Sequence, residues 1–242
     1  MGEKDAGQTR SEAADVAVRC LFMAVGVSLV GAGIALAKYS QTGTTPISVP
    51  AAIVADAAAR DGNAKLTLGT CVFVLNMLFL AGQVALLRRD FAPMQLLQIP
   101  AQLVMSWSCD RWMLLWQHIP LANYAVQLDC LASSIMLLGL GICLEVKANV
   151  IMIPGDAFVR VAAHVLGRPF PRCKVVFDTS LMALGVVMSF VLLDGLFDVR
   201  EGTIISATLT GRAVQLCNRL LAPLDNVLPP GASVIPPVVP GA

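Results

Sequence analysis

The sequence predicts an all-α polytopic membrane protein with about six transmembrane helices in two inverted three-helix repeats, each with a short proline-initiated half-helix. Two observations predict this class. Hydrophobic residues make up 57% of the 242 residues and charged residues only 14%, whereas about a quarter of an average soluble domain is charged. In addition, an apolar glycine-containing segment recurs 108 positions later in the chain. Composition therefore indicates the membrane, and the repeat indicates a duplicated unit.

The repeat aligns residues 30–58 with residues 138–166 without a gap. The first copy reads G-A-G-I-A-L from Gly31 and the second G-L-G-I-C-L from Gly139, and a proline follows each at the same distance. The identical positions, numbered in the first copy, are Gly31, Gly33, Ile34, Leu36, Pro46 and Ala55. Each half is expected to hold three spans, an odd number, so the second copy would be inverted relative to the first.

The elements follow in order along the chain. Residues 1–18 are polar and are expected in the cytoplasm, residues 19–116 and 121–222 form the two membrane repeats, and residues 223–242 form a proline-rich tail expected to be disordered. The segments expected to span the bilayer are 19–37, 68–87, 93–115, 121–146, 174–193 and 202–222.

Two further apolar segments, 44–58 and 152–166, are too short to cross about 30 Å of hydrocarbon. They contain Pro46 and Pro154, which suit the first turn of a helix because proline lacks the N–H that would be unpaired there. Two interpretations remain open for these segments. They are either amphipathic helices lying at the membrane surface or half-helices that enter the protein interior.

Basic residues predict the orientation. With the N-terminus in the cytoplasm, inner segments collect twelve Lys and Arg residues and outer segments five, which follows the positive-inside rule. Trp107, Trp112 and Trp116 would then lie at the outer end of the third span, where an aromatic belt is expected. We therefore expect a multi-pass protein of the inner (cytoplasmic) membrane with both termini in the cytoplasm.

Polar residues recur on one face of two predicted spans. Gln95, Gln98 and Gln102 lie three or four positions apart in the third span, and the same face continues to Ser106 and Asp110. The sixth span carries a similar line, formed by Thr203, Ser206 and Thr210. Such side chains either line a solute path or form hydrogen bonds between helices, which are common in membranes.

The charged residues within or beside the spans are the other candidates. Asp156 and Arg160 are four positions apart, so they either pair along a helix or form a charge pair at a cytoplasmic gate. Asp178 is either a protonatable coupling group or a partner for Arg172 or Lys174. Glu201 belongs to an acidic group at the outer end of the last two spans.

Several function classes lack their sequence signatures. The chain has no H-E-x-x-H pattern, no G-x-S-x-G elbow and no Walker loop. Its seven cysteines form no C-x-x-C, so neither a metal centre nor a disulfide framework is predicted. A net charge of +1 gives no indication of nucleic-acid binding. We expect no cofactor and no bound metal.

Three second-half motifs resemble bacterial membrane proteins of the YitT/YczE/YyaS type: I-P-G-D-A-F at 153–158, K-V-V-F-D at 174–178 and V-R-E-G-T-I-I-S-A at 199–207. The first half matches through G-A-G-I-A-L, T-P-I-S and L-T-L-G, and no acid there corresponds to Asp156. The resemblance covers about residues 20–222. It implies a multi-span inner-membrane protein and no particular activity. The matching positions are Pro46, Pro154, Gly155, Asp156, Lys174, Asp178, Glu201, Gly202 and Thr203.

These observations favour a small secondary transporter or permease for an unidentified polar or amphipathic small molecule. The alternative is a non-transporting membrane scaffold or accessory subunit, and a membrane enzyme is the weaker third interpretation. The expected partners are the lipid bilayer and the small-molecule substrate, and a homo-oligomer stays open. The residues predicted to line the substrate path are Pro46, Gln98, Gln102, Pro154, Asp156, Arg160, Asp178, Glu201, Thr203, Ser206 and Thr210.

Overall fold

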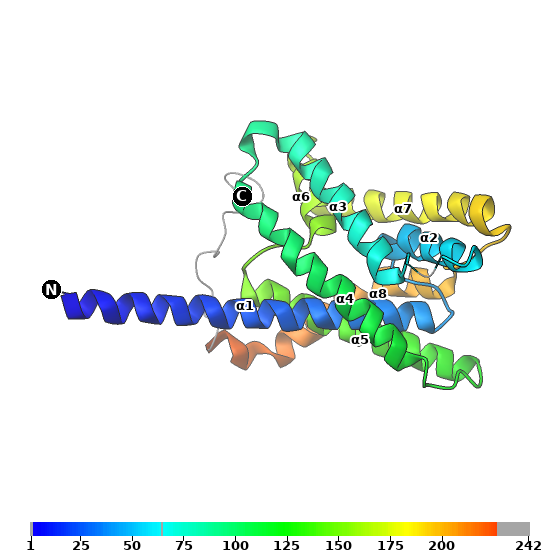
Figure 1. Ribbon diagram of the computed structural model, residues 1–242, viewed down its shortest axis with the longest axis horizontal. Helices are drawn as coiled ribbons and strands as arrows, with labels where there is room; N and C mark the ends of the chain where they lie inside the picture. The colour runs from blue at the N-terminus through cyan, green and yellow to red at the C-terminus, as the bar shows by residue number, and fades with distance from the viewer. Residues whose placement is uncertain (1, 64, 227–242) are drawn as a thin grey trace.

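The computed structural model describes residues 2–63 and 65–226, and within them the regular structure is entirely helical (Figure 1). The predicted tail at 223–242 lies mostly outside these residues. The main helices are α1 (Gly2–Tyr39), α2 (Val49–Arg60), α3 (Leu68–Leu87), α4 (Gln98–Trp116), α5 (Tyr124–Ala148), α6 (Pro154–Val165), α7 (Phe170–Leu193) and α8 (Glu201–Leu220). Short 3-10 turns lie at Pro46–Ser48, Arg88–Asp90, Pro93–Leu97 and Ala222–Asn226.

Four helices in the described part of the chain are long and apolar enough to cross a membrane: Asp15–Tyr39, Leu68–Asp90, Tyr124–Ala148 and Phe170–Leu193. They coincide with four of the six predicted spans and indicate a membrane protein that crosses the bilayer several times. The other two predicted spans are the more polar helices α4 and α8. Helix α4 begins at Gln98, since Pro93–Leu97 forms a 3-10 turn before it.

Helices α1 and α5 cross in opposite directions at the centre of the molecule (Figure 1). Glycines allow this close approach: a Cβ atom on Gly26 would lie 2.9 Å from the carbonyl oxygen of Gly141, and one on Gly141 would lie 2.7 Å from that of Gly26. Gly33 packs in the same manner against Leu138. The two backbones are therefore in direct contact at this crossing, as is common where small residues lie between membrane helices.

The two short helices pack against the same pair of long helices. Helix α2 contacts α7 and α3, and α6 contacts α3 and α7. Pro46 opens the 3-10 turn that leads into α2, and Pro154 opens α6, both in keeping with proline's preference for a first turn. Val49, Ile53 and Val161 are almost fully buried on these helices. Both short helices therefore have a face packed inside the protein.

The last two helices of each half differ in packing. Helix α3 packs along α4, where Asp110 accepts a hydrogen bond from the backbone N–H of Gly69 at 2.8 Å. Helices α7 and α8, although consecutive in the chain, form no comparable contact within the described residues. Helix α8 instead packs on α5. This leaves a space between α7 and α8 that the first half does not have.

Candidate functional site

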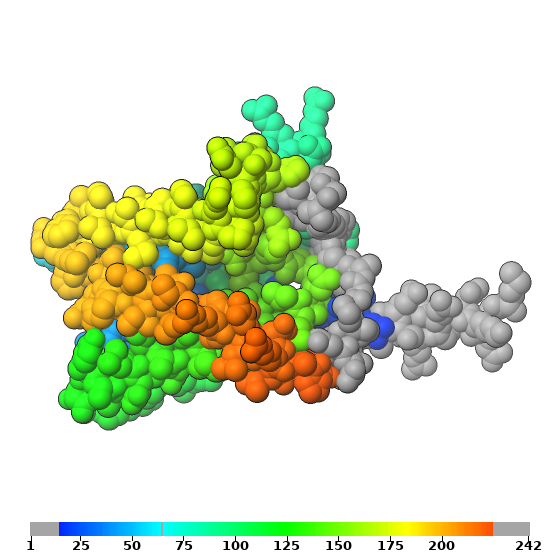
Figure 2. Space-filling view, turned by 180° about the vertical axis from the view of Figure 1, so that it is seen from behind, coloured from blue at the N-terminus to red at the C-terminus, as the bar shows by residue number. Residues whose placement is uncertain are grey.

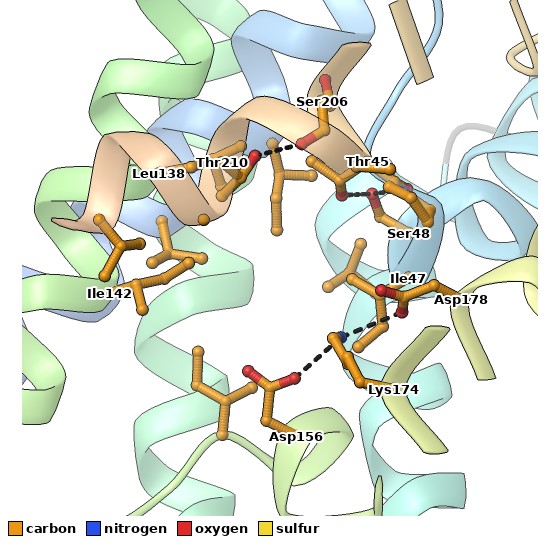
Figure 3. Close-up of a pocket in the computed structure, with 18 of the residues that line it drawn as sticks. Thr45, Ile47, Ser48, Leu138, Ile142, Asp156, Lys174, Asp178, Ser206 and Thr210 are labelled. Carbon is orange, nitrogen blue, oxygen red and sulfur yellow. Dashed lines mark hydrogen bonds and ion pairs between the residues drawn. The ribbon is translucent and has the colours of Figure 1, made fainter. Parts of the chain in front are cut away.

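A cavity of about 370 Å³ lies where elements of both halves meet (Figure 3). It is within the range of roughly 300–1,000 Å³ that small-molecule pockets occupy. Its walls come from α1, α3, α4, α5, α6, α7, α8 and the turn before α2. The aliphatic part of the lining includes Val30, Ile34, Val72, Leu75, Leu138, Ile142 and Val214.

An ion triad lies at one end of the cavity (Figure 3). Lys174 Nζ is 2.9 Å from Asp156 Oδ1 and 3.0 Å from Asp178 Oδ1. Asp156 lies in the first turn of α6, where a carboxylate also favours the helix dipole. With both carboxylates ionised the triad carries one negative charge in excess. We call these three residues the inner triad.

Three phenylalanines join α3, α6 and α7 beside the inner triad. The ring centroids of Phe79 and Phe177 are 5.2 Å apart in an edge-on arrangement, and those of Phe79 and Phe158 are 5.8 Å apart and stacked. Lys174 Nζ lies 6.0 Å from the centroid of Phe177. The aromatic cluster packs these three helices together next to the charges.

Hydroxyl and amide groups form the remaining polar lining. The hydroxyls of Thr45 and Ser48 hydrogen-bond each other, and Thr210 Oγ1 donates to the Ser206 carbonyl oxygen at 2.7 Å (Figure 3). The side-chain N–H of Asn76 donates to the carbonyl oxygen of Val72 at 3.0 Å. The Asn76 Oδ1 atom is buried and has no hydrogen-bond partner among the described residues. Asn76 is one of the lining residues, so an unpaired acceptor lies beside the cavity.

A second cluster of charges closes the opposite end of α7, and we call it the outer triad. Lys38 Nζ lies 2.6 Å from both carboxylate oxygens of Asp198 and also pairs with Asp56 Oδ2 at 2.5 Å. Lys174 is in the first turns of α7, and Asp198 follows its last turn. At 1.5 Å per residue, α7 separates the two triads by about 30 Å.

Two loops interlock around the outer triad. The Asp198 carbonyl oxygen accepts hydrogen bonds from the backbone N–H of Thr44 at 3.2 Å and from Thr203 Oγ1 at 3.0 Å. The N–H of Gly202 donates to the Thr42 carbonyl oxygen at 2.9 Å. Burial raises the pKa of Asp198 to about 6; Lys38 lowers it and Asp56 raises it. The carboxyl group is thus placed to titrate near neutral pH.

The rim of the cavity lies between α7 and α8. Val175 on α7, and Ala207 and Gly211 on α8, line the cavity and are also exposed on the surface. Figure 2 shows the corresponding hollow between the two helices, with earlier parts of the chain visible at its floor. The cavity opens through the side of the helical bundle, in the space left by the missing α7–α8 contact.

Five of the predicted path residues line this cavity: Pro46, Asp156, Asp178, Ser206 and Thr210. Gln98 and Gln102 are buried elsewhere between helices. Gln98 exchanges hydrogen bonds with Gln83 of α3 at 3.3 Å, and Gln83 also donates to the Pro154 carbonyl oxygen at 3.0 Å. Gln98 and Pro154 thus belong to a network that ties α4, α3 and α6 together.

The other three predicted residues lie outside the cavity lining. The guanidinium of Arg160 is 5.9 Å from the ring centroid of Phe170, and Asp156 pairs with Lys174 in place of Arg160. Glu201 is exposed at the start of α8 and accepts a hydrogen bond from Tyr124. Thr203, fully buried, belongs to the interlocked loops of the outer end.

The sequence prediction did not include Asn76, Lys38 or Lys174 among the path residues. Asn76 interrupts the apolar run 68–87, and a polar residue inside a span is a functional candidate in its own right. Lys174 is predicted as one of two partners for Asp178 and as a position that matches the family resemblance, and its Nζ atom lies 3.0 Å from Asp178 Oδ1. No sequence signal brings Lys38 to Asp198, since 160 positions separate them.

In the part of the chain that the structure describes, no three His, Cys, Asp or Glu side chains are grouped so that they could hold a metal ion. No curated protein and no solved structure gives a significant match to the chain. Residues 17–219 match the model of a family of unknown function, DUF6198. Because this match covers most of the chain, the chain belongs to the DUF6198 family.

Proposed function

We propose that the protein is a small secondary transporter or permease of the cytoplasmic membrane, in which two inverted repeats enclose a substrate cavity. The observation that carries the proposal is a partly polar cavity between two ion triads at opposite ends of α7. A carrier needs a central site and two closures that need not open together. The cavity and the triads supply candidates for all three parts.

Contacts 108 positions apart support the inverted repeat. Gly33 packs against Leu138, and Gly141 packs against Val30. Gly141 lies 108 positions after Gly33, and Leu138 lies 108 positions after Val30. In the same way Gly31 faces Met105, and Gly139 faces Ala213, 108 positions after Met105. The contacts of one half thus recur in the other with the partners exchanged.

Helix directions support the same arrangement. Helices α1 and α5 run in opposite directions, as do α3 and α7 (Figure 1). The short helix of each half packs on the third helix of the other half, α2 on α7 and α6 on α3. In the proposed cycle, the gap between α7 and α8 closes as the equivalent gap between α3 and α4 opens. Such an exchange of conformations between inverted repeats would open the two triads in turn, so that water reaches the cavity alternately from each face of the membrane.

Labelling of the cavity from both sides of the membrane tests the proposal. A Thr210→Cys reporter, in a background with Cys20→Ser and Cys173→Ser, would be exposed to a membrane-impermeant maleimide applied to either face of proteoliposomes. The remaining native cysteines of the described chain are buried. The control is Ser134→Cys, which lies fully buried outside the cavity and should react from neither side.

A carrier predicts that the reporter reacts from both faces. Asp198→Asn should increase its reaction from the outer face, and Asp178→Asn from the inner face, because each removes a carboxylate from one triad. Reaction from a single face in all three proteins would contradict the proposal. Uptake assays over a broad panel of solutes would then identify what is moved.

A non-transporting scaffold is the second candidate, and the outward face of α7 favours it. Val176, Val187 and Val191 on this face are 60–72% exposed, so a partner subunit could cover them as well as lipid. The scaffold role predicts one stoichiometric partner after affinity purification, and full function of Asp156→Asn and Asp178→Asn.

We also propose that the family is related to the YitT/YczE/YyaS type and that both termini are cytoplasmic.

A further inference from the structure

The position of the cavity opening restricts how a ligand can reach it. Helix α7 is long and apolar enough to cross a membrane, so the space between α7 and α8 would face lipid hydrocarbon. Val175 at the rim is 65% exposed, and its neighbour Val176 is similarly exposed. Apolar side chains on the rim favour entry of an apolar group from the bilayer over entry of a hydrated solute.

The aliphatic lining fits a hydrocarbon body. Ile34 and Ile142 from the two central helices and Val214 from α8 line the cavity, and no charged residue lies among them. A ligand with an apolar body would bury it against these side chains. A strongly hydrated solute would lose water contacts there without replacing them.

The polar end fits a positively charged donor. The inner triad has two carboxylates for one ammonium, and Lys174 already contacts both of them. Asn76 Oδ1, on a side chain more than nine-tenths buried, has no hydrogen-bond partner in the described chain. Ionised carboxylates only accept hydrogen bonds, so a ligand with N–H donors and positive charge matches this end of the cavity. An anion would meet the excess negative charge instead.

We propose that the cavity binds a cationic amphiphile, an amine on a hydrocarbon body, which enters from the bilayer between α7 and α8. This inference rests on the proposed carrier function and names its substrate class. The ammonium group would lie at the inner triad, and the hydrocarbon against the central helices.

The test uses the full chain in phosphatidylcholine nanodiscs and three probes. Dodecylamine carries both the charge and the chain, dodecanoate has a similar chain with the opposite charge, and butylamine has the amine with little hydrocarbon. Thermal unfolding is followed over a concentration series of each probe, because a ligand that binds the folded state raises the unfolding temperature. We expect clear stabilisation by dodecylamine and little by the other two.

Two variants block the proposed entrance. A Cβ atom on Gly211 would have no atom within 4 Å, so Gly211→Trp should fold while its indole fills the rim. Val175→Trp does the same from α7 if the first variant fails to fold. Each should weaken dodecylamine binding by about tenfold, equivalent to about 1.4 kcal/mol. Leu209→Trp, exposed on α8 and outside the cavity lining, is the matched control and should bind normally.

Equal stabilisation by dodecanoate, equal stabilisation by butylamine, or normal dodecylamine binding to both rim variants would overturn the inference. The labelling experiment separates this outcome from failure of the carrier proposal. If the reporter is labelled from both faces but dodecylamine does not stabilise the protein, the carrier proposal holds and the substrate belongs to another class. A cavity that binds dodecylamine but is labelled from one face only would be a binding site without transport.

Discussion

The first and second halves of the molecule contain the same sequence of helices, but only the first is closed. Helix α3 packs along α4, whereas α7 and α8 stand apart with the cavity between them. The contacts of the central glycines are repeated in both halves, so the difference does not come from the centre. It arises where the polar helix of each half meets its neighbour. A central crossing shared by both halves, with one open and one closed flank, is consistent with the two-state carrier proposed above.

The largest expected effect comes from the shared core. Gly141→Leu should destabilise the protein by about 3 kcal/mol or prevent folding, because the new side chain would overpack the crossing with Gly26 and Val30. Gly211→Leu is the matched control, since its Cβ atom meets open space. Size-exclusion chromatography and thermal unfolding in detergent would compare them. Normal folding of Gly141→Leu would show that the crossing is looser than described.

The two triads should differ in their contribution to stability. Lys38→Met leaves the Asp198 side chain, which is 8% exposed, without its cation and should cost about 3 kcal/mol. Lys174→Met leaves more exposed carboxylates, at 37% and 22%, and should cost about 1 kcal/mol. Thermal unfolding of both variants measures the difference. A larger loss of stability at Lys174 would show that the inner triad contributes more to stability than the outer triad.

The outer triad should also make stability depend on pH. The pKa of Asp198 is raised from 3.8 to about 6 in the folded protein, so the folded state binds this proton more tightly than the unfolded chain. The contribution of the group to the free energy of unfolding is therefore greatest below about pH 4 and declines as the pH rises through about 6. The change should be on the order of 3 kcal/mol.

Comparison of the wild type with Asp198→Asn isolates this group from other carboxylates that titrate in the same range. Thermal unfolding temperatures of the two proteins should diverge between about pH 4 and pH 7, with the wild type losing more stability as the pH rises. Parallel pH profiles would show that Asp198 titrates at its ordinary value.

The smallest effect is expected at Thr203. Thr203→Val removes the hydroxyl that donates to the Asp198 carbonyl oxygen at 3.0 Å and accepts a longer hydrogen bond from the backbone N–H of Arg200 at 3.4 Å. Such bonds average roughly 0.6 kcal/mol in membrane proteins, so the unfolding temperature should fall only slightly. The same substitution at Thr208, whose hydroxyl bonds only within α8, is a control for loss of a local bond. A severe loss at Thr203 alone would mean that the interlocked loops depend on this residue.

Much of the fold could be predicted from periodicity and proline position. The span predicted at 68–87 coincides with α3, and Pro154 begins α6 as its place before an amphipathic segment indicated. These features are local, because length, hydrophobicity and the missing proline N–H act within one helix.

The partners of polar groups could not be predicted in this way. The spacing of Gln98 and Gln102 identifies a helix face, but the face meets Gln83 and neighbouring helices, not the cavity. Asp156 has Arg160 one turn away, yet it pairs with Lys174 from another helix. Long-range packing decides such contacts, and it likewise separates α7 from α8.

Distances between spin labels on the two flanks give the most direct test of the exchange between halves. One label pair, at Val176 and Leu216, reports on α7 and α8, and a second pair, at Leu78 and Leu103, reports on α3 and α4; all four side chains are exposed. Double electron–electron resonance in nanodiscs should show two distances for each pair, with dodecylamine or a change of pH shifting the pairs in opposite senses. One unchanging distance at both flanks would contradict the carrier mechanism.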